Sequence, residues 1–395
     1  MTLRERPRVA VVHDAFTQVG GGERVAATLA ATLDAPLFAA AAVDDVVGAL
    51  DADRPIRTTF VQPLVGRGLP IRFLAPTLPA AFGALDVGRP DVVLSSSTAF
   101  AHHVRVPPGA VHVCYCHAPP RFLWEPDDYF QDPGLRTKLL TPALAAFRQL
   151  DRAAARRVDV YVANSQHTAA RIRDVYGRNA AVVHPPVDTR RFRPTTERSG
   201  RFLVVSRLRP QKRIDLAIAA ANLAGLPLDI VGDGSELASL RERAGPTVRF
   251  LGRLPDGAVR AAMARATAVI VPAIQDFGLT IAEAQASGRP PIAFGRGGAL
   301  EIVDDGRTGF LFHEPTADAL AAAMRRALAA PVNVGQLVES ARRFDVATFE
   351  SAIRTVLGDA IAAKQASPEL DLRSLPDSGP GLPGAPAGTD LGHAG

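Results

Sequence analysis

The sequence is poor in cysteine and has no long apolar run. Its only two cysteines, Cys114 and Cys116, alternate within one apolar segment, a spacing that cannot close a disulfide inside a single strand. We therefore predict that both are core residues. No stretch reaches the roughly 18 apolar residues that a membrane-spanning helix needs, and the first residues lead into a predicted strand at 9–12 without the hydrophobic region of a signal peptide. Both absences predict a cytoplasmic protein.

Composition is typical of a globular protein with more than one domain. Hydrophobic residues make up 47% of the 395 residues, enough for two domains that each bury a core. Short apolar runs alternate with alanine-rich segments of helical composition, which predicts the doubly wound α/β class, with helices on both faces of a parallel sheet. The runs predicted as strands are residues 9–12, 92–95, 111–115, 158–163, 181–184, 202–206, 228–231, 248–251, 269–271 and 291–294.

Three prolines and a polar stretch interrupt both periodicities between residues 184 and 200. We place a domain boundary there, which gives an N-terminal domain of residues 1–195 and a C-terminal domain of residues 196–345. Residues 346–366 are predicted as a last helix. The tail at 367–395 is dense in proline and glycine, and we expect it to be disordered.

A segment near residue 280 is typical of a ligand loop. Residues 268–271 form an apolar run of the kind found in buried strands, and residues 279–287 have helical composition. The loop between them would lie at the carboxyl end of a strand. Gly278 lets the backbone approach a ligand, and the free amides of the helix start can donate to phosphate or sugar oxygens. The side chains singled out in this segment are Gln275, Phe277, Leu279 and Glu283.

Two cations follow the strand predicted at residues 202–206. Arg207 and Lys212 lie in Ser206-Arg-Leu-Arg-Pro-Gln-Lys, at the transition from a strand to a helix. Lys212 is one of only three lysines among 45 basic residues, which indicates that a compact ammonium is preferred at this place. The alternative is a solvated basic helix start.

Together the two segments resemble the family 4 retaining glycosyltransferases. The loop segment is similar to the family's pattern of two glutamates separated by seven residues around Phe-Gly, with Glu283 as the second and Gln275 in place of the first. An amide there can hydrogen-bond sugar hydroxyls but carries no charge. The resemblance covers about residues 8–365. It implies the GT-B architecture, in which two Rossmann-like domains face a central cleft and the last helix crosses back to the first domain.

The resemblance also implies roles for these residues. Arg207 and Lys212 would neutralise the diphosphate of a nucleotide-sugar donor as the glycosidic bond breaks. They would replace a metal ion, so no metal or other cofactor is expected. Glu283 would bind the ribose hydroxyls. Gly232 and Gly252 end two successive strands, where they would let the base approach the backbone.

The N-terminal half carries two further candidate loops. Three glycines follow the first strand and open a helix whose amides could hold an anion, although a flexible turn is the alternative: Gly20, Gly21 and Gly22. His117 lies in a loop at residues 115–125 that resembles bacterial mannosyltransferases of O-antigen and capsule synthesis, and this implies that His117 points at the donor sugar. For Trp124 in the same loop, core packing and sugar stacking are both open.

The net charge of +5 lies entirely in the first half of the chain. Residues 1–195 hold 23 basic and 18 acidic residues, whereas residues 196–395 hold 22 of each. Several arginines surround an apolar helical pattern at 136–157, which suits an anionic membrane surface or, equally, a solvated amphipathic helix. Basic and aromatic residues do not interleave, so nucleic acid is not an expected partner.

The sequence thus predicts a retaining glycosyltransferase that moves a hexose, preferably mannose from GDP-mannose, to a glycan or a polyprenyl- or lipid-linked acceptor. Its context would be cell-surface polysaccharide or glycolipid synthesis, in the cytoplasm or on the inner face of the membrane. The alternatives are a nonhydrolysing sugar-nucleotide epimerase, or a nucleotide-sugar-binding protein with weak or lost turnover. The residues predicted for catalysis are His117, Arg207, Lys212 and Gln275. The residues predicted to bind the donor are Gly21, Gly22, Arg207, Lys212, Gly232, Gly252, Phe277, Gly278, Leu279 and Glu283.

Overall fold

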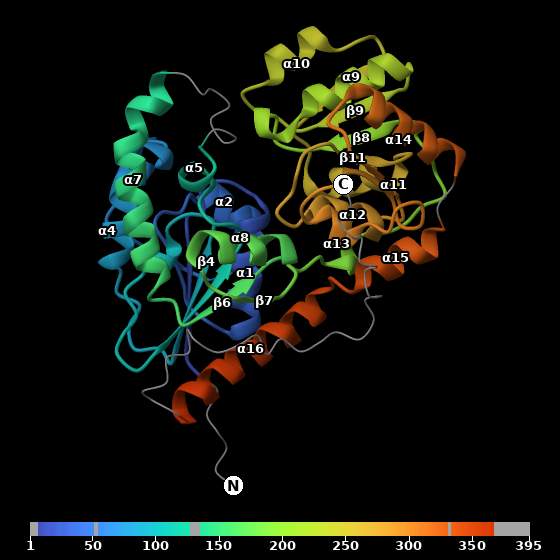
Figure 1. Ribbon diagram of the computed structural model, residues 1–395. Helices are drawn as coiled ribbons and strands as arrows, with labels where there is room; N and C mark the ends of the chain where they lie inside the picture. The colour runs from blue at the N-terminus through green and yellow to red at the C-terminus, as the bar shows by residue number, and fades with distance from the viewer. Residues whose placement is uncertain (1–6, 51–53, 127–134, 331–332, 367–395) are drawn as a thin grey trace, which may run out of the picture.

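The computed structural model describes residues 7–50, 54–126, 135–330 and 333–366, which form two α/β halves side by side (Figure 1). The first half is built on a seven-stranded parallel sheet in the order β3-β2-β1-β4-β5-β6-β7. The second contains a six-stranded parallel sheet in the order β10-β9-β8-β11-β12-β13. The strands are β1 Val9–His13, β2 Leu37–Ala39, β3 Ile56–Thr58, β4 Val92–Ser97, β5 Val111–Cys116, β6 Val160–Ala163, β7 Ala180–Val182, β8 Phe202–Val205, β9 Leu228–Val231, β10 Val248–Gly252, β11 Val269–Val271, β12 Pro291–Phe294 and β13 Phe310–Phe312.

Parallel strands need crossover connections, which the helices supply. Those of the first half are α1 Gly21–Leu33, α2 Asp44–Ala49, α3 Gln62–Gly66, α4 Leu78–Gly83, α5 Arg121–Trp124, α7 Leu135–Ala155 and α8 Gln166–Tyr176, with the 3₁₀ helices η1 Ile71–Thr77, η2 Ala101–His103 and η3 Thr189–Arg191. Those of the second half are η4 Pro210–Lys212, α9 Ile214–Ala224, α10 Leu237–Arg243, α11 Asp256–Arg265, α12 Leu279–Ala286, α13 Ala299–Ile302, α14 Ala317–Ala329 and α15 Val334–Arg342, followed by α16 Val346–Ala366.

Both faces of each sheet are buried. Successive side chains of a strand point to opposite faces, so Val9 and Val11 of β1 pack in one core cluster while Ala10 and Val12 pack in another. In the second half, Val204 and Leu203 of β8 are divided between two clusters in the same way. The predicted doubly wound α/β class is confirmed.

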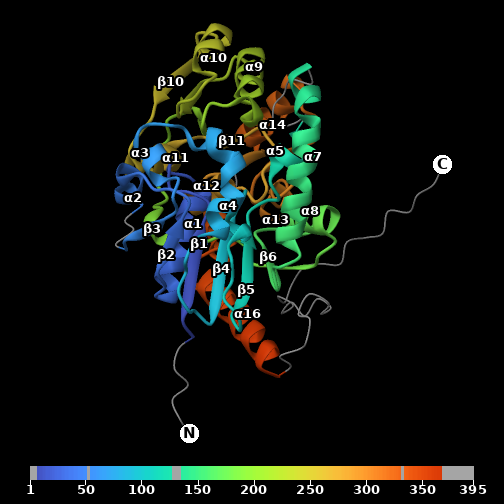
Figure 2. The ribbon, with the colours of Figure 1, turned by 90° about the vertical axis from the view of Figure 1, so that its left-hand side faces the viewer.

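The last helix crosses back to the first half. α16 runs from beneath the second half to lie against the first sheet (Figures 1 and 2). Phe349, Ile353 and Leu357 recur on one helical face and are buried in the same cluster as Val113 of β5. Glu350 accepts a hydrogen bond of 3.0 Å from Thr32 Oγ1 of α1. The expected return of the last helix to the first domain is therefore confirmed.

The predicted strands correspond to observed strands with small shifts. The run predicted at 158–163 begins two residues later, at Val160, and the one predicted at 181–184 ends at Val182, so His184 lies in the following loop. Cys114 and Cys116 are buried free cysteines, as predicted. No described helix is long and apolar enough to cross a bilayer. The tail expected to be disordered, 367–395, lies outside the described residues.

Candidate active site

A cavity of about 370 Å³ lies between the two halves, at the carboxyl ends of their strands. The first half contributes the segments that follow β1, β4, β5 and β6, and the second half contributes those that follow β8 and β11. Most of the residues predicted for the site line this cavity, namely Gly21, Gly22, His117, Arg207, Lys212, Gln275, Phe277, Gly278 and Leu279. The parallel strands explain why these residues come together: the loops at the carboxyl ends of the strands gather at one edge of each sheet, where ligands of open α/β sheets bind.

The glycine loop is a close contact between the halves. α1 begins at Gly21 after the extended residue Gly20, so its first amides have no partner within the helix. A Cβ atom on Gly21 would lie 2.7 Å from Leu279 Cδ1 of the opposite half, and one on Gly22 would lie 3.8 Å from His117 Nε2. The absence of a side chain therefore lets the positive end of α1 approach both Leu279 and the cavity.

His117 is buried and uncharged at neutral pH. Burial lowers its pKa to about 3, and the nearby His13 adds to the shift. Its Nε2 atom lies 2.8 Å from Ser96 Oγ, and Asn164 Nδ2 donates to its backbone oxygen at 2.9 Å. The ring is thus held at the cavity wall as a neutral hydrogen-bonding group, not as a cation.

Asp14, next to His13, has a structural role. Its carboxylate accepts hydrogen bonds from the backbone amides of residues 98–101, including those of Phe100 and Ala101 at 2.7 Å each. Burial opposes its ionisation, but His13 and these amides together lower its pKa. Asp14 therefore fixes the loop after β4.

Arg207, Lys212 and Gln275 meet on the side of the second half. Lys212 Nζ donates to Gln275 Oε1 at 3.0 Å, and Gln275 Nε2 donates to the Ala273 carbonyl at 3.1 Å. Arg207 donates to the side chain of Gln18 in the opposite half. Burial lowers the pKa of Lys212 to about 8, with a further contribution from the positive charge of Arg207. Lys212 therefore faces an amide at the place where the family pattern has a carboxylate.

The loop before α12 has a strained backbone that only glycine adopts readily. Gly278 has φ 111° and precedes the first residue of α12. Earlier in the same loop, Gly298 N donates to the Gln275 carbonyl at 2.9 Å, which fixes the backbone at Gln275. The Phe277 ring packs 5.3 Å from His184 and 5.1 Å from Phe344, between ring centroids, and is buried. Phe277 thus contributes to the wall through its backbone while its side chain anchors the loop.

Three predicted donor-binding residues do not line the cavity: Gly232, Gly252 and Glu283. A Cβ atom on Gly232 would lie 1.8 Å from the Ser206 carbonyl oxygen, so packing against the neighbouring loop already requires this glycine. Gly252 has φ 68°, with open space around it. Burial raises the pKa of Glu283, which lies close to the ion pair between Arg24 and Asp256. Their assignment to the donor stays a prediction.

Contacts across the cleft include residues that the sequence did not single out. Arg171 of α8 binds Asp276 across the cleft at 2.6 Å. Glu301 of α13 accepts hydrogen bonds from the amides of Gln166 and His167, at 2.9 and 3.1 Å, and so caps α8 from the opposite half. Burial opposes the ionisation of Glu301, but His184 and these amides lower its pKa.

Trp124 and the basic helix α7 have a packing role. Trp124 Nε1 donates to Asp151 Oδ2 at 2.8 Å, and the Arg152 guanidinium lies 4.7 Å from the centre of the Trp124 ring. Arg148 Nε donates to the Leu123 carbonyl at 2.6 Å. These contacts favour core packing over sugar stacking for Trp124. Arg148 and Arg152, two of the arginines that suggested a membrane surface, thus contact α5.

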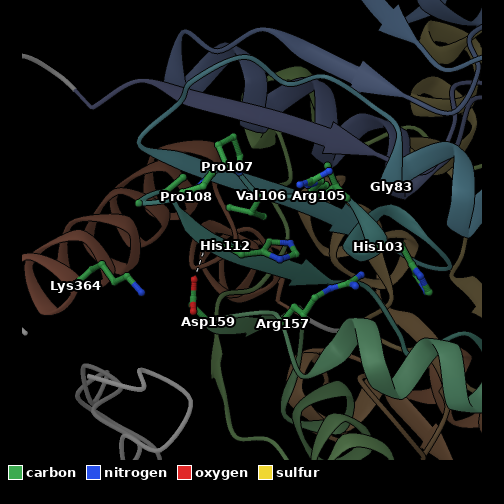
Figure 3. A pocket seen from close by; sticks show the side chains of 13 residues that line it. Gly83, His103, Arg105, Val106, Pro107, Pro108, His112, Arg157, Asp159 and Lys364 are labelled. Carbon is green, nitrogen blue, oxygen red and sulfur yellow. Dashed lines mark hydrogen bonds between the residues drawn. The ribbon is translucent and has the colours of Figure 1, made fainter. Parts of the chain in front are cut away.

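A larger cavity, of about 540 Å³, lies within the first half (Figure 3). It is bordered by the segment that leads from η2 to β5, by His112 of β5 and by Lys364 of α16. None of the residues predicted for the site lies on its wall. It is therefore separate from the candidate active site.

Two family models match adjoining parts of the chain. The model described as Glycosyltransferase Family 4 matches residues 19–191, and the model described as Glycosyl transferases group 1 matches residues 188–345. The two matches divide the chain between the same two α/β halves that enclose the cavity. This chain belongs to the GT-B glycosyltransferases.

Curated relatives match this GT-B chain over part of their lengths. A D-inositol 3-phosphate glycosyltransferase of Nocardioides sp. is 33% identical over 206 residues, which cover 41% of this chain and 45% of the relative. A GDP-mannose-dependent alpha-(1-6)-phosphatidylinositol monomannoside mannosyltransferase of Mycolicibacterium smegmatis is 31% identical over 216 residues, which cover 46% of this chain and 56% of the relative. These two matches thus span about half the length of each relative.

Solved structures share the fold over nearly the whole chain. The Anabaena protein HepE, solved in complex with UDP and glucose, has a TM-score of 0.66 and 20% identity. The superposition covers 89% of this chain and 99% of HepE. At this identity the likeness supports the GT-B fold alone.

Proposed function

We propose that this chain is a retaining glycosyltransferase that uses a nucleotide diphosphate sugar as donor. The observation that carries the proposal is the set of groups in the cavity between the halves. Lys212 and Arg207 supply positive charge from one side, and the amide end of α1 and the neutral His117 lie on the other. Positive charge and helix-start amides attract a diphosphate, and a neutral imidazole can hydrogen-bond a sugar hydroxyl. Both kinds of group are present within one cavity.

In the proposed reaction an acceptor hydroxyl attacks the anomeric carbon from the face that the diphosphate leaves. The bond between that carbon and the phosphate oxygen breaks, and its electron pair goes to the diphosphate. The acceptor's proton passes to the same phosphate oxygen, so no protein base is required and the configuration is retained. Arg207 and Lys212 would stabilise the charge that grows on the leaving group.

Gln275 would act on the donor differently from a carboxylate. Its oxygen is engaged by Lys212 and its amide donates to Ala273, so the side chain is held in one orientation beside the cavity. It offers a dipole and no negative charge to a developing sugar cation. This supports the second candidate function, a nucleotide-sugar-binding protein with weak turnover.

We propose mannose from GDP-mannose as the preferred donor. The loop around His117 supports this, and so does the likeness to a curated relative named as GDP-mannose-dependent. The HepE structure holds UDP and glucose, so UDP-sugars belong in any donor screen. The proposed acceptor is a glycan or a lipid-linked hydroxyl.

We further propose contact with the inner face of a membrane, through the segment at residues 60–73. Phe60 and Phe73 are 60% and 62% exposed, and Leu64 and Leu69 are also exposed. Exposed apolar side chains beside Arg67 and Arg72 suit an anionic lipid surface. Changing both phenylalanines to serine should weaken sedimentation with anionic vesicles; unaltered sedimentation would contradict the proposal.

A donor screen by calorimetry and product analysis tests the main proposal. GDP-mannose and several UDP-sugars are offered to the protein and to the Arg207→Ala and Lys212→Ala variants, with Lys364→Ala as a matched control outside the site. We expect one donor to bind, with the affinity lost in the first two variants and retained in the third. Binding without transfer to any acceptor would favour the binding protein, a changed sugar without acceptor would favour the epimerase, and no binding at all would refute the proposal.

A further inference from the structure

Two histidines and an aspartate form a buried cluster in the first half, away from the cavity between the halves. His102 and His103 lie in η2, which follows β4, and Asp151 lies in the last turns of α7. The three residues are 3%, 5% and 0% exposed, respectively. His103 also borders the larger cavity of the first half (Figure 3). The cluster therefore joins two distant segments of the chain beside that cavity.

The three side chains direct one ligand atom each to a common point. Asp151 Oδ1 lies 3.0 Å from His102 Nε2 and 3.8 Å from His103 Nε2, and all three atoms lie within 4.8 Å of one another. Within the part of the chain that the structure describes, these three atoms pair with one another and have no partner outside the cluster. Ligands of a tetrahedral zinc ion with bonds of about 2.0–2.1 Å lie about 3.3 Å apart. The two distances from Asp151 Oδ1 to the histidine nitrogens lie on either side of this value.

Other side chains orient the cluster from outside. The second oxygen of Asp151 accepts hydrogen bonds from Trp124 Nε1 at 2.8 Å and from Tyr176 OH at 2.9 Å. These two donors hold the carboxylate so that Oδ1 faces the histidines. The other ring nitrogen of His102, Nδ1, lies 3.2 Å from Ser97 Oγ. Carboxylates and histidines that bind metals are commonly held by such outer hydrogen bonds, which fix the tautomer and the ring plane.

We propose that His102, His103 and Asp151 bind one divalent transition-metal ion, for which zinc fits best. Two imidazole nitrogens and one carboxylate oxygen are a donor set that zinc accepts, and a water molecule would complete the tetrahedral coordination. The ion would fasten η2 to α7 and so stabilise the first half. It takes no part in the donor chemistry proposed above.

Metal binding to the chelator-stripped protein tests the proposal. Zn²⁺ is titrated by calorimetry, Co²⁺ is added as a spectroscopic probe, and thermal unfolding is followed with and without Zn²⁺. We expect one ion per chain, the visible absorption of four-coordinate Co²⁺, and a higher melting temperature with Zn²⁺. His103→Gln should lose this binding, and Tyr176→Phe, which removes only an outer hydrogen bond, should weaken it about tenfold.

His112→Gln is the matched control. His112 is also buried and borders the same cavity, but its Nε2 lies 3.0 Å from Ser95 Oγ and it is not part of the cluster. This variant should keep the metal. Absence of stoichiometric binding in the wild type, or equal binding in His103→Gln, would overturn the proposal and leave a buried histidine–aspartate ion pair. Co²⁺ absorption of the wild-type protein decides the question even if the variants fold poorly.

Discussion

Donor affinity should depend on the protonation of Lys212. Burial and the neighbouring Arg207 lower the pKa of Lys212 to about 8, and only its ammonium form attracts a diphosphate. With that pKa about 90% of Lys212 is charged at pH 7 and about 10% at pH 9. Affinity requires the protonated form, so it is high below pH 8 and is lost as the pH rises. We expect it to fall about tenfold between pH 7 and pH 9.

The Gln275→Glu variant should abolish this pH dependence. A carboxylate oxygen in place of Gln275 Oε1 would lie 3.0 Å from Lys212 Nζ. At an effective dielectric constant of about 20, two charges at that distance interact by about 5 kcal/mol, equivalent to about four pKa units before desolvation is subtracted. An upward shift of about two units suffices to keep Lys212 charged at pH 9. The variant should also bind the donor more weakly at pH 7, because the new charge offsets that of Lys212.

Calorimetric titration of the donor at pH 7, 8 and 9 measures both effects. Lys212→Arg is the control, because a guanidinium stays charged from pH 7 to pH 9. The donor affinity of this variant should therefore not change with pH. The nucleobase also titrates at alkaline pH, but it is the same in every arm. A wild-type affinity that is constant from pH 7 to pH 9, or an equal loss in Gln275→Glu, would refute the assignment of this titration to Lys212.

Three further predictions concern the contacts that join the halves. Gly21→Ala places a Cβ atom 2.7 Å from Leu279 Cδ1, the end of a flexible side chain, so Leu279 must move and donor binding should weaken slightly. Gly48→Ala, with open space around it, should leave donor binding unchanged, and equal affinities of the two variants would contradict the close approach. Ser165→Ala removes the α8 cap that accepts from Thr168 N and also the hydrogen bond of 2.6 Å that Ser165 Oγ donates to the Asp276 carbonyl across the cleft. It should cost at least about 1 kcal/mol in chemical denaturation, and an unchanged midpoint would count against both contacts. Glu301→Gln should lower stability at neutral pH, because the folded protein stabilises the ionised carboxylate of Glu301, as its lowered pKa indicates. The difference from wild type should shrink as the pH falls below the ordinary glutamate pKa of 4.5. A difference that persists in acid would contradict a stabilising role for the charge of Glu301.

Strand prediction succeeded where apolar runs are flanked by clear breaks. The runs at β9, β11 and β12 could be predicted to the residue, because each is a short, mostly apolar run that proline or glycine precedes or follows. The three-residue strands β2, β3 and β13 were missed. Two of them, β3 and β13, lie at sheet edges, and strands this short show no periodicity of their own. Their pairing with neighbours decides their structure.

Part of the site could be predicted because each of its loops can be located in the sequence at the end of a predicted strand. Loops after parallel strands meet at one edge of a sheet, so His117, Lys212 and Gln275 could be grouped without knowledge of distances. The contacts of Arg171 and Glu301 could not, since each depends on a partner more than 100 residues away in the chain. The basic pattern of α7 was ambiguous because a solvated helix and a membrane surface call for the same alternation of basic and apolar residues. Only the structure shows that Arg152 covers Trp124.

The charges around the cavity explain what an amide at position 275 does that a carboxylate would not. Asp276, the acid beside it, is already bound by Arg171 at 2.6 Å, so its charge is directed to the opposite half. A glutamate at position 275 would add a second negative charge next to Lys212, at the place where a diphosphate would lie. The amide leaves the charge of Lys212 available and, by the same change, lets its pKa fall to about 8. Strong attraction for a diphosphate near neutral pH and sensitivity to alkaline pH would therefore have one cause.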